Sequence, residues 1–208
     1  MDASPQPGPQ GLYNPRDERD ACGFGLIAQL DDAPSKQLVQ RAIDALVRMT
    51  HRGGVAADGL SGDGCGVLNR KPDAWLRALA GEVKITLGPL YAAGLVFLPH
   101  DEAEAARARE AVGAALREVQ LAAAGWRVVP VDVSACGARA QASMPRIEQL
   151  FVVPALDNDG ARPTPEKVQH SLCLARRRAE QRLRDVAAAS NQDFYVVTLS
   201  AHAIGYKG

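Results

Sequence analysis

The sequence lacks a long apolar run and an excess of charge of either sign. No stretch approaches the roughly 20 apolar residues that span a bilayer. The first 21 residues carry prolines and a charged run at 16–20 where a secretory signal has its apolar region. Lys+Arg and Asp+Glu both count 24, so nothing attracts the chain to nucleic acid or an anionic membrane. We therefore expect a cytoplasmic protein with neither nucleic acid nor membrane as a partner.

Cysteine is scarce and scattered. The four cysteines are Cys22, Cys65, Cys136 and Cys173, with no C-x-x-C pair and no histidine at ligand spacing. This spacing argues against a zinc site, and a reducing cytosol argues against disulfides. Each cysteine taken alone is most simply a small buried hydrophobe. The sequence also lacks the G-x-G-x-x-G of a dinucleotide-binding unit.

The chain changes character at Cys22. Residues 1–21 are rich in Pro and Gly and then charged, without apolar periodicity, which is typical of a detachable leader. The run CGFGLIAQL at 22–30 predicts a buried strand. Residues 22–208 then read as one domain, or part of one, in which helices and strands are mixed.

Periodicity predicts the elements of that domain. An amphipathic helix is expected to start after Ser35 as N-cap and to stop at the glycines of HRGG. Further helices are expected over 72–80, over 101–123 and from 164 or 165 to 186, and strands following a Gly-rich turn at 62–69 and over 91–98, 126–133, 147–153 and 194–200. The arginine-rich side of the last helix is interpreted as a solvated face with carboxylate neighbours rather than as a phosphate site.

Cys22 is the residue with the clearest chemical potential. Two glycines follow it at 23 and 25 in the apolar run, which suggests a close backbone approach. If residues 1–21 were removed, its α-amine, with a usual pKa of about 8, could serve as base for its own thiol, with a usual pKa of about 8.5. From the residues alone, a structural role for an internal cysteine stays open.

Four blocks, in order, resemble the glutaminase domain of the glutamate synthases. They are RDACGFGLIA at 19–28, ALVRMTHRGGVAADGLSGDGCGVL at 45–68, SMPRIEQLFV at 143–152 and DFYVVTLS…YKG at 193–208. The resemblance covers residues 17–208 and implies a class II glutamine amidotransferase. It implies that Cys22 attacks the amide of glutamine as substrate, releases ammonia and forms a glutamyl thioester that water hydrolyses. It also implies the N-terminal nucleophile hydrolase fold, a four-layer α/β/β/α sandwich with two stacked, largely antiparallel sheets.

The resemblance places four further residues near the nucleophile. Gly23 follows Cys22 directly, and Arg52 and Gly53 lie in a His-Arg-Gly turn that looks like the family's turn beside the nucleophile. A basic residue at a helix C-terminus is also favourable in its own right, so that reading of Arg52 stays open. Asp63, like Asp58, lies in a Gly-rich loop, where we prefer side-chain to backbone hydrogen bonds that fix the loop to a catalytic role.

The sequence departs from the family in what it does not contain. The family's Asn-Gly oxyanion donors, and the Arg and Asp that hold glutamine, follow the YKG block and have no counterpart here. We therefore expect an incomplete, N-terminal part of the sandwich with exposed sheet edges. These 208 residues alone should show no measurable glutaminase activity. The remainder of the synthase or a partner chain would supply the rest.

The resemblance also bears on cofactors. In the family, FMN and an iron–sulfur cluster belong to the synthase portion, so no cofactor is expected in these 208 residues. Two other functions stay open. One is a non-catalytic truncated relative that binds a partner through an open sheet edge, and the other is a different Cys-nucleophile hydrolase that cleaves a linear amide.

Overall fold

The computed structural model describes residues 23–31, 33–62, 64–155, 163–186 and 194–208. The expected leader and Cys22 lie outside them. The described elements are α1 (Lys36–Arg48), η2 (Thr50–Arg52), β1 (Gly66–Arg70), α2 (Asp73–Glu82), β2 (Ala92–Leu98), α3 (Glu102–Arg117), β3 (Leu121–Val128), η3 (Val133–Ala135), α4 (Ala138–Ser143), β4 (Arg146–Pro154), α5 (Pro165–Val186), β5 (Tyr195–Ser200) and β6 (Ala203–Lys207).

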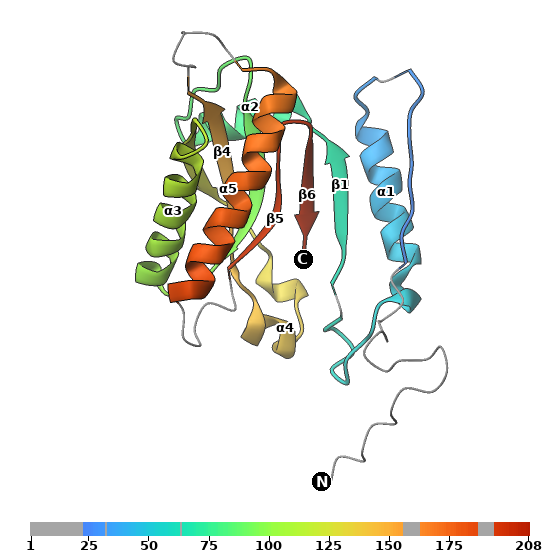
Figure 1. Cartoon of the computed structure of the whole chain (residues 1–208). Coiled ribbons are helices and arrows are strands. Elements are labelled where there is room, and N and C mark those ends of the chain that lie inside the picture. Colours follow the sequence, from blue (N-terminus) through green and yellow to red (C-terminus); the bar gives the residue numbers. More distant parts are fainter. Residues whose placement is uncertain (1–22, 32, 63, 156–162, 187–193) are drawn as a thin grey trace, which may run out of the picture.

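Two antiparallel sheets organise these elements. One has four strands in the order β3-β4-β2-β5, and the other pairs β1 with β6. Helices α3 and α5 cover one face of the larger sheet, β6 and β1 lie on its other side, and α1 lies beyond β1 (Figure 1). The order of layers is therefore α/β/β/α, which confirms the fold class that the resemblance implies.

Alternation along the central strands divides the core between the two faces of the larger sheet. On β2, Ala92 and Val96 belong to the cluster beneath α3 and α5, whereas Ala93 belongs to the opposite cluster. Leu150 and Phe151 on β4 divide in the same way, as the two-residue period of a strand requires. The second cluster is completed by apolar side chains of α2, of β6 and of the residue just before β2: Leu76, Leu79, Ala80, Tyr91 and Ile204.

Ion pairs also hold helix α3 against the larger sheet and against helix α5. Glu148 on β4 is only 2% exposed and accepts hydrogen bonds from Arg109 Nη2 of α3 at 2.7 Å and from Arg146 Nε at 2.6 Å. Glu118, at the end of α3, pairs with Arg178 and Arg182 of α5. The arginine-rich face of α5 therefore has the carboxylate neighbours that the sequence predicts.

The helix predicted over 101–123 ends earlier than its composition suggests. The expected span of 101–123 begins correctly, since the Asp101 side chain accepts a hydrogen bond from the Glu104 N–H as an N-cap. It ends at Arg117, however, and Gln120 turns the chain with φ +61°. Ala122 and Ala123 then pair with β4. Alanine propensity is a weak preference that this strand pairing overrides.

The predicted buried strand at 22–30 is wrong for the residues that are described. Residues 23–29 form no strand and all of 23–30 are exposed, with Phe24 at 91% and Leu30 at 100%. The apolar pattern is real, but no described strand pairs with this segment, which runs alongside α1 (Figure 1). Helix α1 is present with its Ser35 cap, yet it buries none of its side chains.

The interpretation of the cysteines as small buried residues is also wrong for two of the three that the structure describes. Cys65 and Cys173 are exposed, and Cys136 is partly buried. Cys173 lies on the solvent side of α5, next to Leu172 of the buried stripe. Its position on the helix, rather than its residue type, decides its exposure.

Candidate active site

The structure describes three of the five predicted site residues. Gly23 is exposed at the start of the segment that runs along α1, Arg52 ends η2, and Gly53 follows it. Cys22 and Asp63 lie outside the described residues. Figure 1 shows the start of the segment 23–30 and the turn that follows α1 at the same end of that helix. The proximity of Arg52 to Cys22 stays a prediction.

The end of α1 explains how the chain turns into this region. The Met49 N–H still donates to the Ala45 and Leu46 carbonyls, and the Thr50 hydroxyl donates to the Val47 carbonyl at 2.6 Å. The Gly53 N–H then closes η2 by donating to the Thr50 carbonyl at 3.2 Å. The helix thus tightens into a short 3₁₀ turn at the predicted His-Arg-Gly position, as helix ends commonly do.

Asp58 fixes the loop that follows. Its Oδ1 accepts hydrogen bonds from the backbone N–H groups of Leu60, at 3.1 Å, and Ser61, at 2.8 Å, and its Oδ2 accepts from the Ser61 hydroxyl at 2.6 Å. An antiparallel bridge joins Val55 to Gly62 and closes the loop. The loop-fixing role predicted for Asp58 is therefore confirmed.

The same hydrogen bonds control the charge on Asp58. They lower the pKa of its carboxyl from the usual 3.8 to about 2, with the Ser61 hydroxyl as the largest cause, followed by the Ser61 and Leu60 N–H groups. Donors to an ionised carboxylate favour the charged form. Asp58 is consequently a carboxylate at any pH near neutrality.

This loop docks on helix α4, a contact that the sequence analysis missed. Ser61 is only 7% exposed, and its Oγ accepts a hydrogen bond from the Ala140 N–H at 3.3 Å. Gly137 permits the approach, because a Cβ at that position would lie 2.5 Å from Asp58 Oδ2 and closer still to Ser61 Oγ. Ser61 and Ala140 are 79 residues apart, so no local pattern could have revealed the contact.

The Gly-rich turn after this loop meets the end of β6. The Cys65 N–H donates to the Gly208 carbonyl at 2.8 Å, and the Gly208 N–H donates back to the Cys65 carbonyl at 3.0 Å. Gly64 has φ +88°, and a Cβ there would lie 2.5 Å from the Gly208 carbonyl oxygen. The second and fourth sequence blocks are thus spatial neighbours through the pairing of β1 with β6.

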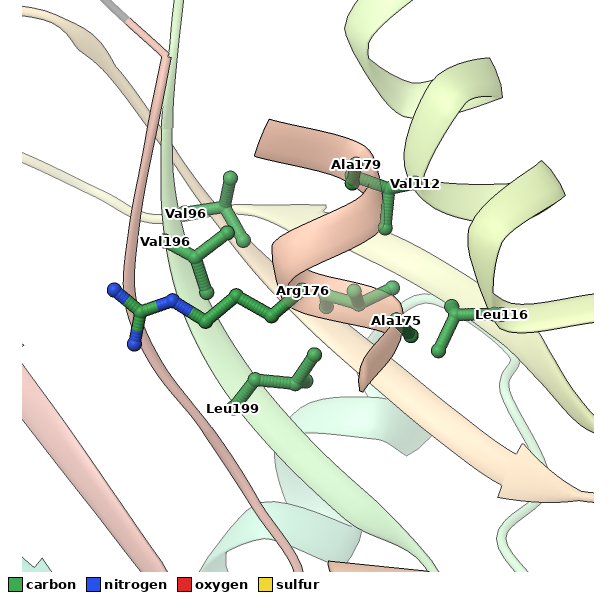
Figure 2. A pocket seen from close by; sticks show the side chains of 9 residues that line it. Val96, Val112, Leu116, Ala175, Arg176, Ala179, Val196 and Leu199 are labelled. Atoms are coloured by element: carbon green, nitrogen blue, oxygen red, sulfur yellow. The ribbon is translucent and has the colours of Figure 1, made fainter. Parts of the chain in front are cut away.

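A cavity elsewhere does not suit a substrate. It has a volume of about 10 Å³ and is lined almost wholly by apolar side chains of α3, α5 and the larger sheet. Arg176 lines it too, but its guanidinium extends past Val196 and away from the apolar side chains (Figure 2). This space lies on the opposite side of the larger sheet from β1 and β6. We interpret it as a small packing defect.

The described residues contain no group of three or more His, Cys, Asp or Glu side chains arranged to hold a metal ion. None of the helices in the described part of the chain combines the length and apolar character that a membrane crossing requires.

Comparison with known proteins gives consistent matches. A family model described as "Glutamine amidotransferases class-II" matches residues 22–208. The glutamate synthase (NADPH) large chain of Bacillus subtilis (strain 168) is 32% identical over 209 residues, which is 100% of this chain and 13% of that protein. The corresponding large chain of Azospirillum brasilense is 37% identical over 94% of this chain, and the chloroplastic ferredoxin-dependent glutamate synthase of Oryza sativa subsp. japonica is 35% identical over 92% of it. This chain spans only 12% of the length of each of these last two proteins.

Proposed function

The chain belongs to the class II glutamine amidotransferases, and on that premise we propose that it is a glutaminase part of a glutamate synthase, with Cys22 as nucleophile. The observation that carries the proposal is the family match, which begins at Cys22 and leaves out residues 1–21. That boundary coincides with the change of composition in the sequence. The similarity to glutamate synthases over 92 to 100% of the chain supports the same assignment.

The proposed chemistry begins with removal of residues 1–21, which frees the α-amine of Cys22. That amine takes the proton of the thiol, and Sγ attacks the side-chain carbonyl carbon of glutamine. The carbon–nitrogen bond of the side-chain amide then breaks, and the departing nitrogen takes the proton held by the α-amine. Ammonia is released, and a glutamyl thioester on Cys22 remains. Water adds to the thioester, the carbon–sulfur bond breaks, and glutamate and the free thiol are formed. One residue thus supplies nucleophile and base.

In this proposal the loop after α1 supports the nucleophile. Arg52 would add positive charge near the thiolate, which lowers a thiol pKa and raises the fraction of reactive anion. Gly53 would let the backbone turn close to the substrate, and Asp63 would hold the Gly-rich turn ahead of β1. The hydrogen bonds of Asp58 support this reading of Asp63, because they show how an aspartate fixes the same stretch of chain.

A larger assembly is part of the same proposal. The side chains of Phe24, Leu26 and Leu30 are at least 89% exposed, and contiguous exposed apolar surface commonly marks a contact with another polypeptide. The relatives' far greater length supports the synthase itself as that polypeptide. The flavin and iron–sulfur cluster of the family would then belong to that portion.

Ammonia release tests the proposal. The native protein, purified with any subunit that accompanies it, should begin at Cys22 by intact-mass and N-terminal analysis and should release ammonia from glutamine. Cys22→Ser should abolish the release, because a serine hydroxyl is a much poorer nucleophile. Cys173→Ser, which alters an exposed thiol on α5, should not.

The same assay addresses the two alternatives. A protein that binds the synthase portion but releases no Cys22-dependent ammonia would be the non-catalytic relative. Turnover of other linear amides in preference to glutamine would indicate a different cysteine hydrolase. Either result would contradict the proposed function.

A further inference from the structure

We propose that Asp58 and Ser61 are positioning residues for the glutaminase site: they hold the loop 50–62 against helix α4 and so fix the backbone that carries Arg52 and Gly53. This inference rests on the proposed function. It names residues that act through others, since neither Asp58 nor Ser61 belongs to the predicted pocket.

The two ends of the loop are joined to each other, so a displacement of Ser61 is passed to both of them. The bridge between Val55 and Gly62 brings its two ends together, and a Cβ at Gly62 would lie 3.0 Å from the Gly54 carbonyl oxygen. The Ala56 N–H donates to the Ser61 carbonyl at 2.8 Å. Within the loop, Arg52 and Gly53 lie just before the part that this bridge closes, and Asp63 follows that part directly in the sequence. A displacement of Ser61 would therefore also displace the backbone that carries Arg52 and Gly53 on one side and Asp63 on the other.

Helix α1 gives the loop little other fixation. It leads directly into η2, but none of its side chains is fully buried, and apolar ones such as Leu38 and Leu46 are only partly buried. The segment 23–30 beside it is exposed along its whole length. Side-chain burial on the core is what normally holds a helix in place. The loop's anchorage to α4 is correspondingly important for where Arg52 lies.

The anchorage itself is a polar contact with tight steric limits. Ser61 Oγ lies between the Asp58 carboxylate, to which it donates, and the Ala140 N–H, from which it accepts. Gly137 leaves no room for a side chain between the two elements. The contact thus joins the loop to the segment that leads into β4 of the larger sheet.

The chain provides a matched control for this contact. Asp132 Oδ1 accepts from the Ser134 N–H at 3.1 Å and from the Ser134 hydroxyl at 2.6 Å, so an aspartate again binds both the backbone and the hydroxyl of a nearby serine. Both of these bonds are exposed and local. Asp132→Ala removes an equivalent motif without touching the loop that carries Arg52.

The test compares two alkylation rates at Cys22 in the native protein with any accompanying subunit. The rate with a glutamine chloroketone depends both on the Cys22 thiolate and on a glutamine pocket formed beside it. The rate with iodoacetamide depends on the thiolate alone. Ser61→Ala and Asp58→Ala should lower the chloroketone rate relative to the iodoacetamide rate roughly 10- to 100-fold, because an ångström-scale displacement of supporting groups costs about that much. Ser61→Thr, which keeps the hydroxyl, should recover most of the loss, and Asp132→Ala should match wild type.

The outcomes are separable. Wild-type protein whose Cys22 reacts with neither reagent would overturn the proposed function itself. If the wild type is labelled and a folded Ser61→Ala keeps its full chloroketone selectivity, the positioning role is wrong although the proposed function stands. Should Ser61→Ala fail to fold, Asp58→Asn decides by the same ratio, because its Oδ1 still accepts from the Ser61 N–H while its amide no longer accepts the hydroxyl proton.

Discussion

Asp58 gives the molecule a local pH dependence that can be worked out by sign. Its carboxyl has a pKa of about 2 in the folded chain and an ordinary value of 3.8. A carboxyl with a lowered folded pKa contributes stability above its unfolded value and loses it as the pH falls through the folded one. Its contribution should therefore be fully present above about pH 4 and should disappear towards pH 2.

Asp58→Asn checks this expectation. The wild type should be more stable than the variant at pH 6, and the difference should shrink steadily between about pH 4 and pH 2. Urea denaturation of both proteins across that range measures it. A difference that stayed constant down to pH 2 would mean that the charge on Asp58 does not stabilise the loop.

At neutral pH, substitution of Glu148 should lower the free energy of unfolding more than substitution of Asp58 does. Removal of Glu148 leaves Arg109 and Arg146, whose side chains are only 20% and 30% exposed, without their buried acceptor. Glu148→Ala should lower the free energy of unfolding by about 3 kcal/mol, near the lower end for a broken buried pair, because both arginines keep Glu102.

An exposed pair supplies the comparison for Glu148. Glu110 and Arg117 form a solvent-exposed ion pair on α3, so Glu110→Ala should change the free energy of unfolding by no more than about 1 kcal/mol. Urea unfolding of both variants gives the two values. Equal effects would show that the ion pairs of Glu148 with Arg109 and Arg146 contribute no more to the free energy of unfolding than an exposed pair does.

Among the elements, α1 and α5 should differ sharply in local stability. Helix α5 has 22 residues with a buried stripe that includes Val168, Leu172 and Ala175, whereas α1 has 13 residues and no buried side chain. An isolated helix of that length is marginal in water. In the 208-residue chain, amide hydrogens of α1 should exchange with solvent much faster than those of α5.

Hydrogen exchange followed by mass spectrometry measures this difference peptide by peptide. Protection of α1 equal to that of α5 would mean that its apolar face is covered in solution. Loss of that protection on dilution would identify a second copy of the chain as the cover.

The elements also show how far the sequence could predict the fold. The cap at Ser35, the helix after Pro72 and the strands at 91–98 and 147–153 follow from local patterns, so they were predictable. The end of α3 was not, because pairing of Ala122 with Val153 outweighs alanine propensity.

In the candidate site too, contacts between residues close in the sequence were predictable, and contacts between remote residues were not. Asp58 was predictable as a loop-fixing residue because its partners lie two and three residues away. Its joint contact with Ser61 on α4 was not, since Ala140 is remote in sequence. The segment 23–30 shows the converse limit: an apolar pattern predicts that a surface is suited to burial, but the described fold provides nothing that buries it.

At the scale of the whole molecule, the two halves of the sandwich should respond differently to polar substitution. Val39 and Val47 of α1 are exposed, so Val39→Gln and Val47→Gln should change the free energy of unfolding of the 208-residue chain by about 0.5 kcal/mol or less. Leu172→Gln on α5 buries an amide in the core and should cost several kcal/mol.

Denaturant unfolding of the 208-residue chain compares these substitutions. The same α1 variants should weaken association with the synthase portion in the native protein, as size-exclusion chromatography of the assembly would show. If the α1 variants were as damaging to the isolated chain as Leu172→Gln, that face would already be buried within the chain.

The most direct test of the central claim is where a glutamine chloroketone reacts. The native protein is incubated with the reagent, digested, and its cysteine peptides are quantified by mass spectrometry, with excess glutamine as competitor. We predict labelling at Cys22, starting from a free N-terminus and suppressed by glutamine, with little label on the exposed thiols of Cys65 and Cys173. Label found mainly on Cys65 or Cys173, or label on Cys22 that glutamine does not suppress, would contradict the assignment of Cys22 as the glutaminase nucleophile.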